Sequence, residues 1–453
     1  MKLAAIIAFL ILHSLTVFGG DEYGPGQKDL DHNAVDKLNH NSFKAHFYRP
    51  SGKHLNDKIS PSNNTITVSP SGEISTLQQA IQQADSGTVI TLQPGTYKEH
   101  NVIIDKPVTI KGTGEVIIDG EQLGFVLQVT SSHVTIRDLE VHNSKMSFTE
   151  DYAGILLEQV QHVTVENVTL KNNFFGIYLA KSSDVSIRNN TILSKSTRET
   201  TSGNGIHLWY CKNITIENNV VDGHRDGIYF EFVEDSEIHN NISKNNLRYG
   251  LHFMFSDSCT YSGNTFAHNS AGVAVMFTDH VIMRDNIFRD NWGAASYGIL
   301  LKEISDSEII NNDFINNTTA LHIEASNRIK IKHNNIHDNG VGIRIMSNSV
   351  DNSITENNFL ENTFNVTTNS RQNYSSFSRN YWSDYDGYDL NRDGIGDVPH
   401  RPVSLFAILV ERYPQALVLL RSLVTDLLNT AERVMPVLTP ESLVDEKPLM
   451  EKI

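Results

Sequence analysis

A glycine-led apolar segment recurs through the middle of the chain at nearly constant spacing. Its copies begin at Gly154, Gly176, Gly205, Gly227, Gly250, Gly272, Gly298, Ala320 and Gly342. Most successive starts are 22 or 23 residues apart, and the exceptions are spacings of 29 and 26. A period near 22 residues leaves no room for a strand–helix–strand unit, so we expect each copy to be one coil of a solenoid.

The chemistry of the coils indicates which solenoid. The glycine-led segments are rich in β-branched and aromatic residues and alternate with period two, as strands do. A second strand follows in most coils, for example ITIENN from Ile214, and pairs such as Asn218-Asn219 close it. Asparagine tolerates left-handed backbone geometry, which suits a corner repeated on every coil. The sequence therefore predicts an all-β solenoid, a right-handed parallel β-helix.

The rest of the chain is divided by composition around this repeat. We expect a secretory signal at residues 1–19, a polar arm with four histidines at 20–64, the β-helix at 65–372, an Asp/Gly-rich loop at 373–403, and a C-terminal helix and tail at 404–453. The segment around Leu77 carries an apolar helical stripe and is expected to cap the open first coil. The C-terminal helix is expected to break at Pro414.

Charge and cysteine content narrow the function. The net charge is −16, which disfavours a nucleic-acid partner. The apolar run near the start is too short to span a membrane, so export by cleavage is the preferred interpretation over an anchor. The two cysteines, Cys211 and Cys259, fall in different columns about two coils apart, and we expect no disulfide between them.

The third and fifth residues of each copy should face outward, and there the composition is unusual. His207, His252, Met254 and Met276 fall within four successive coils. Imidazole and thioether together are a ligand set for Cu(I). We predict a Cu(I) site centred on His252, Met254 and Met276, with His207 as a further ligand. The alternative is that a loop or a partner covers this face and the methionines only pack against it.

The loop DLNRDGIGD resembles the first part of a calcium loop. Asp389, Asn391, Asp393 and Asp397 occupy ligand positions, and Gly394 lies at the sharp turn. The twelfth position holds His400 where a bidentate Glu is expected. The two interpretations are a Ca²⁺-binding turn and a cluster of Asx turns whose carboxylates accept hydrogen bonds from their own backbone.

Several longer motifs carry a resemblance to a known family. RYGLHFMFSDS from Arg248, AGVAVMFTDH from Ala271, NYWSDYDGYDLNRDGIGDVPHRP from Asn380 and the closing PVLTPESLVDEKPLM are similar to the NosD family. The resemblance covers essentially the whole mature chain. It implies a periplasmic, non-enzymatic copper-binding protein of nitrous oxide reductase maturation in denitrification. It also implies four partners: an ABC transporter membrane subunit at the inner membrane, its cytoplasmic ATPase, a copper-chaperone lipoprotein, and nitrous oxide reductase.

Two other function classes stay open from the residues alone. β-Helices also serve as polysaccharide lyases or epimerases, and Tyr229, Glu231, Arg248 and His252 are groups that such an enzyme of uronate polymers could use. The methionine pair contributes nothing to proton abstraction from a sugar. A purely structural scaffold would leave the histidine and methionine columns unexplained.

Overall fold

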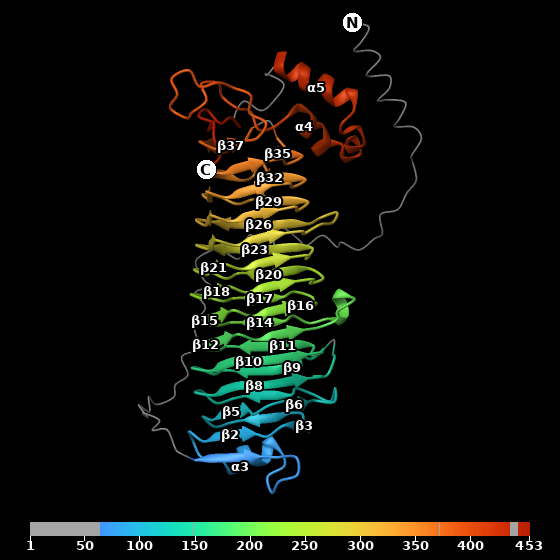
Figure 1. Ribbon diagram of the computed structural model, residues 1–453, viewed down its shortest axis with the longest axis vertical. Coiled ribbons are helices and arrows are strands. Elements are labelled where there is room, and N and C mark those ends of the chain that lie inside the picture. Colours follow the sequence, from blue (N-terminus) through green and yellow to red (C-terminus); the bar gives the residue numbers. More distant parts are fainter. Residues whose placement is uncertain (1–63, 148, 371, 435–442) are drawn as a thin grey trace, which may run out of the picture. The chain divides into compact units, whose positions relative to one another are not determined.

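The computed structural model describes residues 64–147, 149–370, 372–434 and 443–453. The expected secretory signal and the polar arm, apart from residue 64, lie outside the described residues. From residue 64 onward, parallel strands stack coil upon coil along one axis (Figure 1). The fold is a right-handed parallel β-helix, which confirms the fold class predicted from the repeat.

One row of strands contains the glycine-led copies and forms a 12-stranded parallel sheet. Its strands are β4 (Val102–Ile104), β7 (Leu127–Val129), β9 (Ala153–Glu158), β11 (Phe175–Ala180), β14 (Ile206–Trp209), β17 (Ile228–Glu231), β20 (Tyr249–Met254), β23 (Ala271–Asp279), β26 (Tyr297–Ser305), β29 (Thr319–Glu324), β32 (Val341–Ile345) and β35 (Phe364–Thr368).

The remaining 25 strands form two further rows, which are joined because β8 and β10 run through both. The first row is β1 (Thr65–Val68), β2 (Val89–Leu92), β5 (Thr109–Gly112), β8 (Thr135–His142), β10 (Thr164–Lys171), β12 (Ser183–Arg188), β15 (Lys212–Glu217), β18 (Glu237–His239), β21 (Thr260–Ser262), β24 (Ile282–Arg284), β27 (Glu308–Ile310), β30 (Lys330–Lys332), β33 (Val350–Thr355) and β36 (Tyr374–Ser378). The second row adds β3 (Gly95–Lys98), β6 (Val116–Asp119), β13 (Thr191–Leu193), β16 (Val220–Asp222), β19 (Ile242–Lys244), β22 (Thr265–Ala267), β25 (Ile287–Arg289), β28 (Asp313–Ile315), β31 (Asn335–His337), β34 (Asn358–Leu360) and β37 (Tyr381–Trp382).

The core lies inside the coils and follows the predicted alternation. The second and fourth residues of each copy point inward, and Leu251 and Phe253 are fully buried. Cys211 and Cys259 are buried and free, as expected from their different columns. Parallel pairing runs past residue 372, the limit expected from the repeat, to β36 and β37.

The asparagine pairs form the corner between the first and second rows. The first member is left-handed, with φ of 56° at Asn218 and 57° at Asn240. The second member is buried, and its amide group bonds the next coil: the Asn219 backbone N–H and Nδ2 both donate to Asn241 Oδ1 at 2.9 Å. The same ladder runs through Asn190, Asn219, Asn241, Asn264, Asn286, Asn312, Asn334, Asn357 and Asn380. Each asparagine of the ladder accepts a hydrogen bond from a buried backbone N–H group at the corner, where strand pairing supplies no acceptor.

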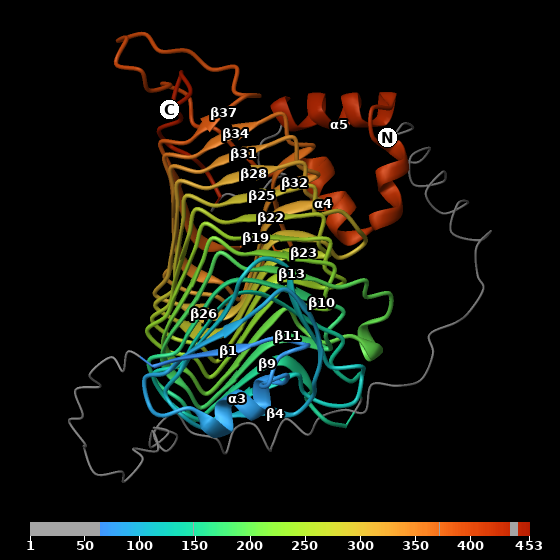
Figure 2. The same ribbon diagram turned by 60° about the horizontal axis from the view of Figure 1, so that its bottom comes forward.

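The first coil is capped by α3 (Leu77–Gln83), as predicted (Figure 2). Thr76 Oγ1 accepts the Gln79 N–H at 3.2 Å and so starts the helix. Leu77, Ala80 and Ile81 are buried against the coil. At the other end of α3, Lys106 Nζ donates to three carbonyl oxygens, including that of Ala84 at 2.8 Å.

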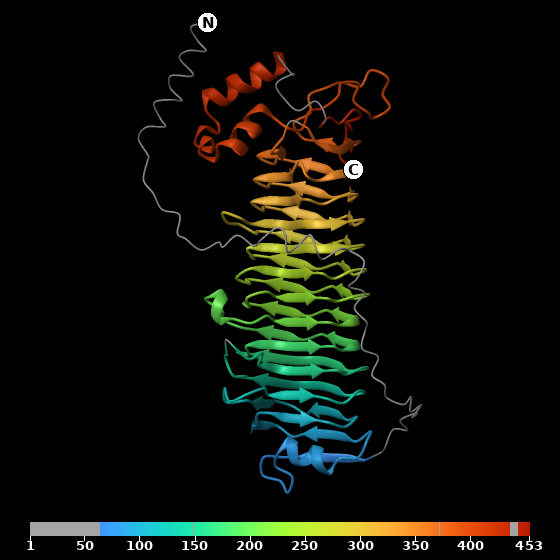
Figure 3. The ribbon, with the colours of Figure 1, turned by 180° about the vertical axis from the view of Figure 1, so that it is seen from behind.

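The C-terminal region lies at the end of the coils opposite α3 (Figure 3). It comprises α4 (Leu405–Arg412), a 3-10 helix η2 (Pro414–Leu419) and α5 (Leu423–Val434). Pro414 interrupts the helix as predicted, and a second break follows before α5. Phe406 and Ala407 of α4 pack on Phe364 of β35. Among the described residues, no helix has the length and apolar character needed to cross a membrane.

The expected C-terminal tail returns to the last coil. Asp445 pairs with Phe377 and with His400, and Leu449 pairs with Tyr381. The Asp445 carboxylate takes the position that the next asparagine of the ladder would occupy, because its Oδ2 accepts both the backbone N–H and Nδ2 of Asn380. Residues 443–453 therefore close the end of the ladder.

Candidate metal centre on the 12-stranded sheet

The register of the 12-stranded sheet aligns the predicted columns. His207, Tyr229 and His252 are consecutive partners in the third column. Met254 and Met276 are direct partners in the fifth column. The structure therefore brings the two thioethers onto neighbouring rungs, with His252 two residues from Met254 on the same side of β20.

Tyr229 lies between the two predicted histidine ligands. Its ring centroid is 4.8 Å from that of His207 and 4.8 Å from that of His252. Tyr178 packs on the far side of His207 at 4.7 Å. The two imidazoles are thus separated by a full rung, and the Tyr229 ring stands where direct contact between them would be.

Burial keeps His207 neutral. Its Nδ1 lies 3.0 Å from Asn204 Nδ2, which can donate to it when the ring carries its proton on Nε2. Burial, with the positive charge of Arg225 adding, lowers the pKa of His207 to about 3. A neutral imidazole is the form that binds metals.

His252 is much more buried than an outward face suggests, with 5% of its surface exposed. The rings of Tyr229 and Tyr249 cover it, at centroid distances of 4.8 and 4.7 Å. Among the described residues, neither of its ring nitrogens has a hydrogen-bond partner. A buried nitrogen without a partner is costly, and a bound ligand would remove that cost.

A buried carboxylate lies beside His252. Asp226 is fully buried, and its Oδ2 is 3.8 Å from His252 Nδ1. The Nε atoms of Arg225 and Arg248 lie 3.7 and 3.8 Å from the same carboxylate, which balances its charge. The separation between Asp226 and Nδ1 is longer than a hydrogen bond, so Asp226 lies beside the imidazole without bonding to it.

The methionine side chains are partly exposed on the same face. The Tyr229 hydroxyl donates to Met254 Sδ at 3.6 Å. Burial raises the pKa of Tyr229 to about 12, so the hydroxyl keeps its proton at neutral pH. Tyr229 therefore holds the sulfur of Met254, and both methionine side chains stay partly exposed.

Sequence reasoning missed the residues that precede each glycine. Asn204, Asp226 and Tyr249 stand directly before Gly205, Gly227 and Gly250, and they form a column of their own beside the histidines. A signal was present, because two of the three are polar side chains directly before a glycine-led strand. Asn204 and Asp226 are fully buried where the chain turns into that strand, and Tyr249 is partly buried.

The structure does not gather the predicted residues into a hard-metal site. Across the described ranges, no three His, Cys, Asp or Glu side chains converge as a metal-binding group. In the 389–397 loop, Asp389 accepts hydrogen bonds from the backbone N–H groups of Arg392 and Gly394, at 2.6 and 2.8 Å. Gly394 has a φ of +82°, as the sharp turn requires. These contacts fit both interpretations of the loop, and calcium binding stays a prediction.

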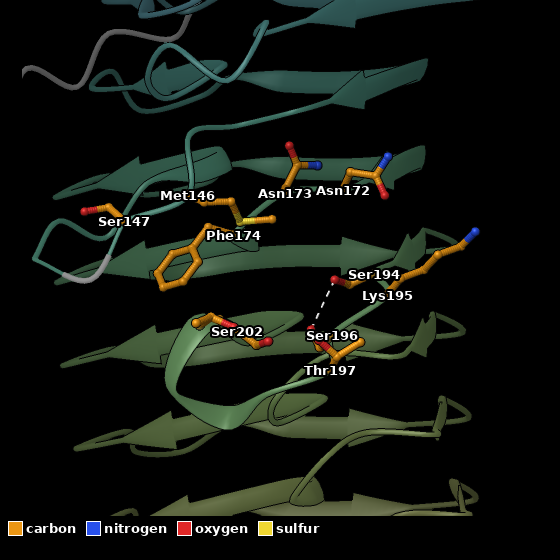
Figure 4. A pocket seen from close by; sticks show the side chains of 12 residues that line it. Met146, Ser147, Asn172, Asn173, Phe174, Ser194, Lys195, Ser196, Thr197 and Ser202 are labelled. Atoms are coloured by element: carbon orange, nitrogen blue, oxygen red, sulfur yellow. Dashed lines mark hydrogen bonds between the residues drawn. The ribbon is translucent and has the colours of Figure 1, made fainter.

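A separate cavity of about 350 Å³ opens where the 29-residue spacing inserts a loop before β14 (Figure 4). The 3-10 helix η1 (Glu199–Thr201) belongs to this loop. Most of the lining residues carry a hydroxyl or amide group, and Met146 and Phe174 are the large apolar ones. Ser194 and Ser196 hydrogen-bond each other at 3.3 Å within it. None of the predicted copper ligands lines this cavity.

Comparison with known proteins identifies the family. The model of the family described as periplasmic copper-binding protein (NosD) matches residues 57–199 and 194–387. The chain belongs to the NosD family. A NosD relative from Pseudomonas aeruginosa, named probable ABC transporter binding protein NosD, is 30% identical over 387 residues, which are 81% of this chain and 89% of that protein. The NosD of Stutzerimonas stutzeri, named in the same words, is 27% identical over 82% of this chain and 88% of its own.

Solved structures agree with this NosD chain in fold alone. A family 28 exopolygalacturonase of Yersinia enterocolitica superposes with a TM-score of 0.53 at 11% identity, over 70% of this chain and 78% of its own. The surface adhesin PfbA of Streptococcus pneumoniae gives 0.52 at 15% identity, over 72% of this chain and 91% of its own. An enzyme and an adhesin on one fold show that function has to be argued from the site.

Proposed function

We propose that this chain binds Cu(I) on the outer face of the 12-stranded sheet and hands it on during assembly of the copper centres of nitrous oxide reductase. The observation that carries the proposal is the in-register pair Met254 and Met276 beside the unpartnered imidazole of His252. Thioether and imidazole donors favour Cu(I) over hard cations. The site should therefore discriminate against Zn²⁺ and Mg²⁺.

The two cysteine thiols of the described solenoid are out of reach. Cys211 and Cys259 face the interior and are fully buried. Burial raises the pKa of both thiols to about 12, so neither offers a thiolate. The thiols therefore do not compete with the methionine pair, whose partly exposed side chains suit exchange with a partner better than storage.

The proposed partners are supported by the names of the relatives. The two NosD relatives are named as ABC transporter binding proteins. We propose that this chain lies in the periplasm and is held at the inner membrane by the transporter's membrane subunit. The cytoplasmic ATPase would drive that transporter. It would receive copper from a copper-chaperone lipoprotein and pass it towards nitrous oxide reductase. The exposed apolar side chains Val418, Leu423 and Leu427 at the C-terminal end offer the docking surface for the membrane subunit.

The alternative of a uronate lyase or epimerase is less well supported. A tyrosine base needs a pKa near the working pH, whereas the pKa of Tyr229 is raised to about 12 by burial. Arg248 lies beside the buried Asp226, where it balances that carboxylate. Incubation with alginate and pectate should give no unsaturated product, and its appearance would favour the enzyme.

The test of the copper proposal is Cu(I) affinity measured by competition with a chromophoric chelator. We expect Met254→Leu with Met276→Leu, and separately His252→Ala, to weaken Cu(I) binding by about tenfold or more. Leucine keeps the apolar volume and removes the sulfur, so the fold should be retained.

The matched control is Met346→Leu. Met346 is the fifth-column thioether directly after β32, a strand that carries Arg344 in place of a histidine, and its loss should leave affinity unchanged. If the parent, the methionine variant and the histidine variant bound Cu(I) with equal affinity, the copper site would not be on this face. The histidine-containing arm at residues 20–64 would then be tested next.

A further inference from the structure

Four aromatic side chains stack along the corner that follows the methionine column. Tyr210, Phe232, Phe255 and Phe277 each come directly after a fifth-column residue, and Phe255 and Phe277 follow Met254 and Met276. Successive ring centroids are 4.6, 5.2 and 5.1 Å apart, and the rings are within 19° of parallel. We call these four residues the aromatic ladder.

The backbone of this corner does not require aromatic residues. All four residues are left-handed, with φ between 51° and 55°. The same corner is left-handed in other coils, with φ of 52° at Lys181, 53° at Glu303 and 48° at Ala325, so the fold imposes this geometry whatever the side chain. At the next corner of the coil, asparagine adopts the same left-handed conformation at Asn218 and Asn240. A left-handed corner therefore does not require an aromatic side chain. The rings also stay accessible: Tyr210 is 37% and Phe255 41% exposed.

A column of carboxylates borders the aromatic ladder. Glu234, Asp257 and Asp279 each lie two residues after an aromatic rung and are stacked in register, and we call them the acidic border. Lys212 is 3.4 Å from Glu234 and partly balances it. The Asp257 carboxylate accepts the backbone N–H of Asp279 at 2.8 Å, so these two acidic residues are direct neighbours. Ionised acids beside an apolar strip attract a cationic partner.

We propose that the aromatic ladder and the acidic border together dock a protein segment that carries aromatic or aliphatic side chains flanked by lysine or arginine. Aromatic anchors within a charged rim are the usual composition of a protein-binding surface. The surface adjoins the methionine pair, so a partner seated there would place its own chain beside the proposed copper ligands. The role of this docking in copper transfer rests on the proposed copper function, whereas the docking itself is measured without copper.

The probe is a fluorescently labelled synthetic peptide of alternating phenylalanine and lysine, compared with the same peptide bearing glutamate for lysine. The parent protein should bind the lysine peptide about tenfold more tightly than the glutamate peptide, and the preference should weaken with salt. The test variant is Phe232→Asn, Phe255→Asn and Phe277→Asn combined. It should lose about tenfold or more of the affinity for the lysine peptide.

The same variant separates binding from folding. Asparagine suits the left-handed corner, so the melting temperature should be unchanged or higher. The matched control is Glu303→Asn, which changes the left-handed residue of the same column on the next coil and should leave peptide affinity within about twofold. The aromatic variant should keep parental Cu(I) affinity, and Met254→Leu with Met276→Leu should keep peptide binding.

Several results would each overturn the proposal. They are equal peptide affinity in parent and aromatic variant, equal affinity for the lysine and glutamate peptides, a fall in melting temperature of the aromatic variant, and binding of an alginate oligosaccharide that the aromatic variant loses. Concentration-dependent self-association of the parent, abolished in the aromatic variant, would assign the surface to a second copy instead. Loss of Cu(I) binding with intact peptide preference would reject only the copper proposal.

Discussion

Asp445 is expected to hold the last coil closed, although it lies 65 residues after the coil it caps. Its carboxylate accepts from the backbone N–H groups of Arg379, Asn380 and Lys447, from Asn380 Nδ2 and from Trp382 Nε1, at 2.9–3.1 Å. Both Asn380 and Trp382 are buried. Asp445→Ala would take this acceptor away from three buried donor groups.

The expected loss of stability on Asp445→Ala follows from those three donor groups. Asn380 Nδ2 would still donate to the Ile354 carbonyl oxygen, so this group would lose only part of its hydrogen bonding. A buried donor left unsatisfied costs about 1–3 kcal/mol, and the three share one site, so we expect a loss of about 3–4 kcal/mol. Solenoid coils open locally, and the loss should fall on β36 and β37 and not on the whole chain. Opening of the last coil should become about 100- to 1,000-fold more frequent.

Hydrogen exchange of a peptide covering residues 374–383 measures this opening. Asp445→Asn keeps an oxygen facing Asn380 and should cost less than Asp445→Ala. The control is Glu446→Ala, which removes an exposed neighbouring carboxylate and should leave exchange at the parental rate. If Asp445→Ala exchanged no faster than Glu446→Ala, the end of the asparagine ladder would not need the carboxylate.

Three further outcomes are expected. Burial lowers the pKa of His224 to about 4, below the unfolded value of about 6.5, so the free energy of unfolding should fall as pH drops below 6.5, by about 2 kcal/mol at pH 5 for this group. In urea denaturation at pH 7 and pH 5, His224→Gln should lose less stability than the parent between the two pH values. His268→Gln should lose as much as the parent. Excess Ca²⁺ should raise the melting temperature over chelator in the parent but not in Asp389→Ala, and identical melting of the parent in both would leave the loop closed by its own Asx turns. Val418→Ser with Leu423→Ser and Leu427→Ser should abolish co-purification with the transporter's membrane subunit, whereas Leu390→Ser, at another exposed leucine, should not; unimpaired co-purification would reject docking through η2 and α5.

These point substitutions are preferable to deleting residues 404–453. From the sequence alone, that region is a helix followed by a tail. The structure places Asp445 and Leu443 in buried contact with the last coil. A deletion would therefore remove the cap together with the docking surface, and a negative result could not be assigned to either.

The sequence by itself determined the coil. Alternation along a strand is a local property, so the inward Phe253 and the outward Met254 follow from their positions in one copy. Constant coil length fixes the register between copies, which is why the spacing of the repeat is enough to pair Met254 with Met276. The left-handed corners follow in the same way from the asparagine pairs, because the backbone preference of one residue decides them.

Only the tertiary structure decided which outward residues are reachable. His252 belongs to an outward column, yet Tyr249 from its own coil and Tyr229 from the preceding coil bury it. Asp226 lies beside it because the chain turns into β17 at that point, and no periodicity encodes that contact. The closing of the ladder by Asp445 depends on a return of the chain over 65 residues. Period and register are properties of one coil and its neighbour, whereas burial and long-range closure depend on side-chain volumes and loop paths from several coils at once.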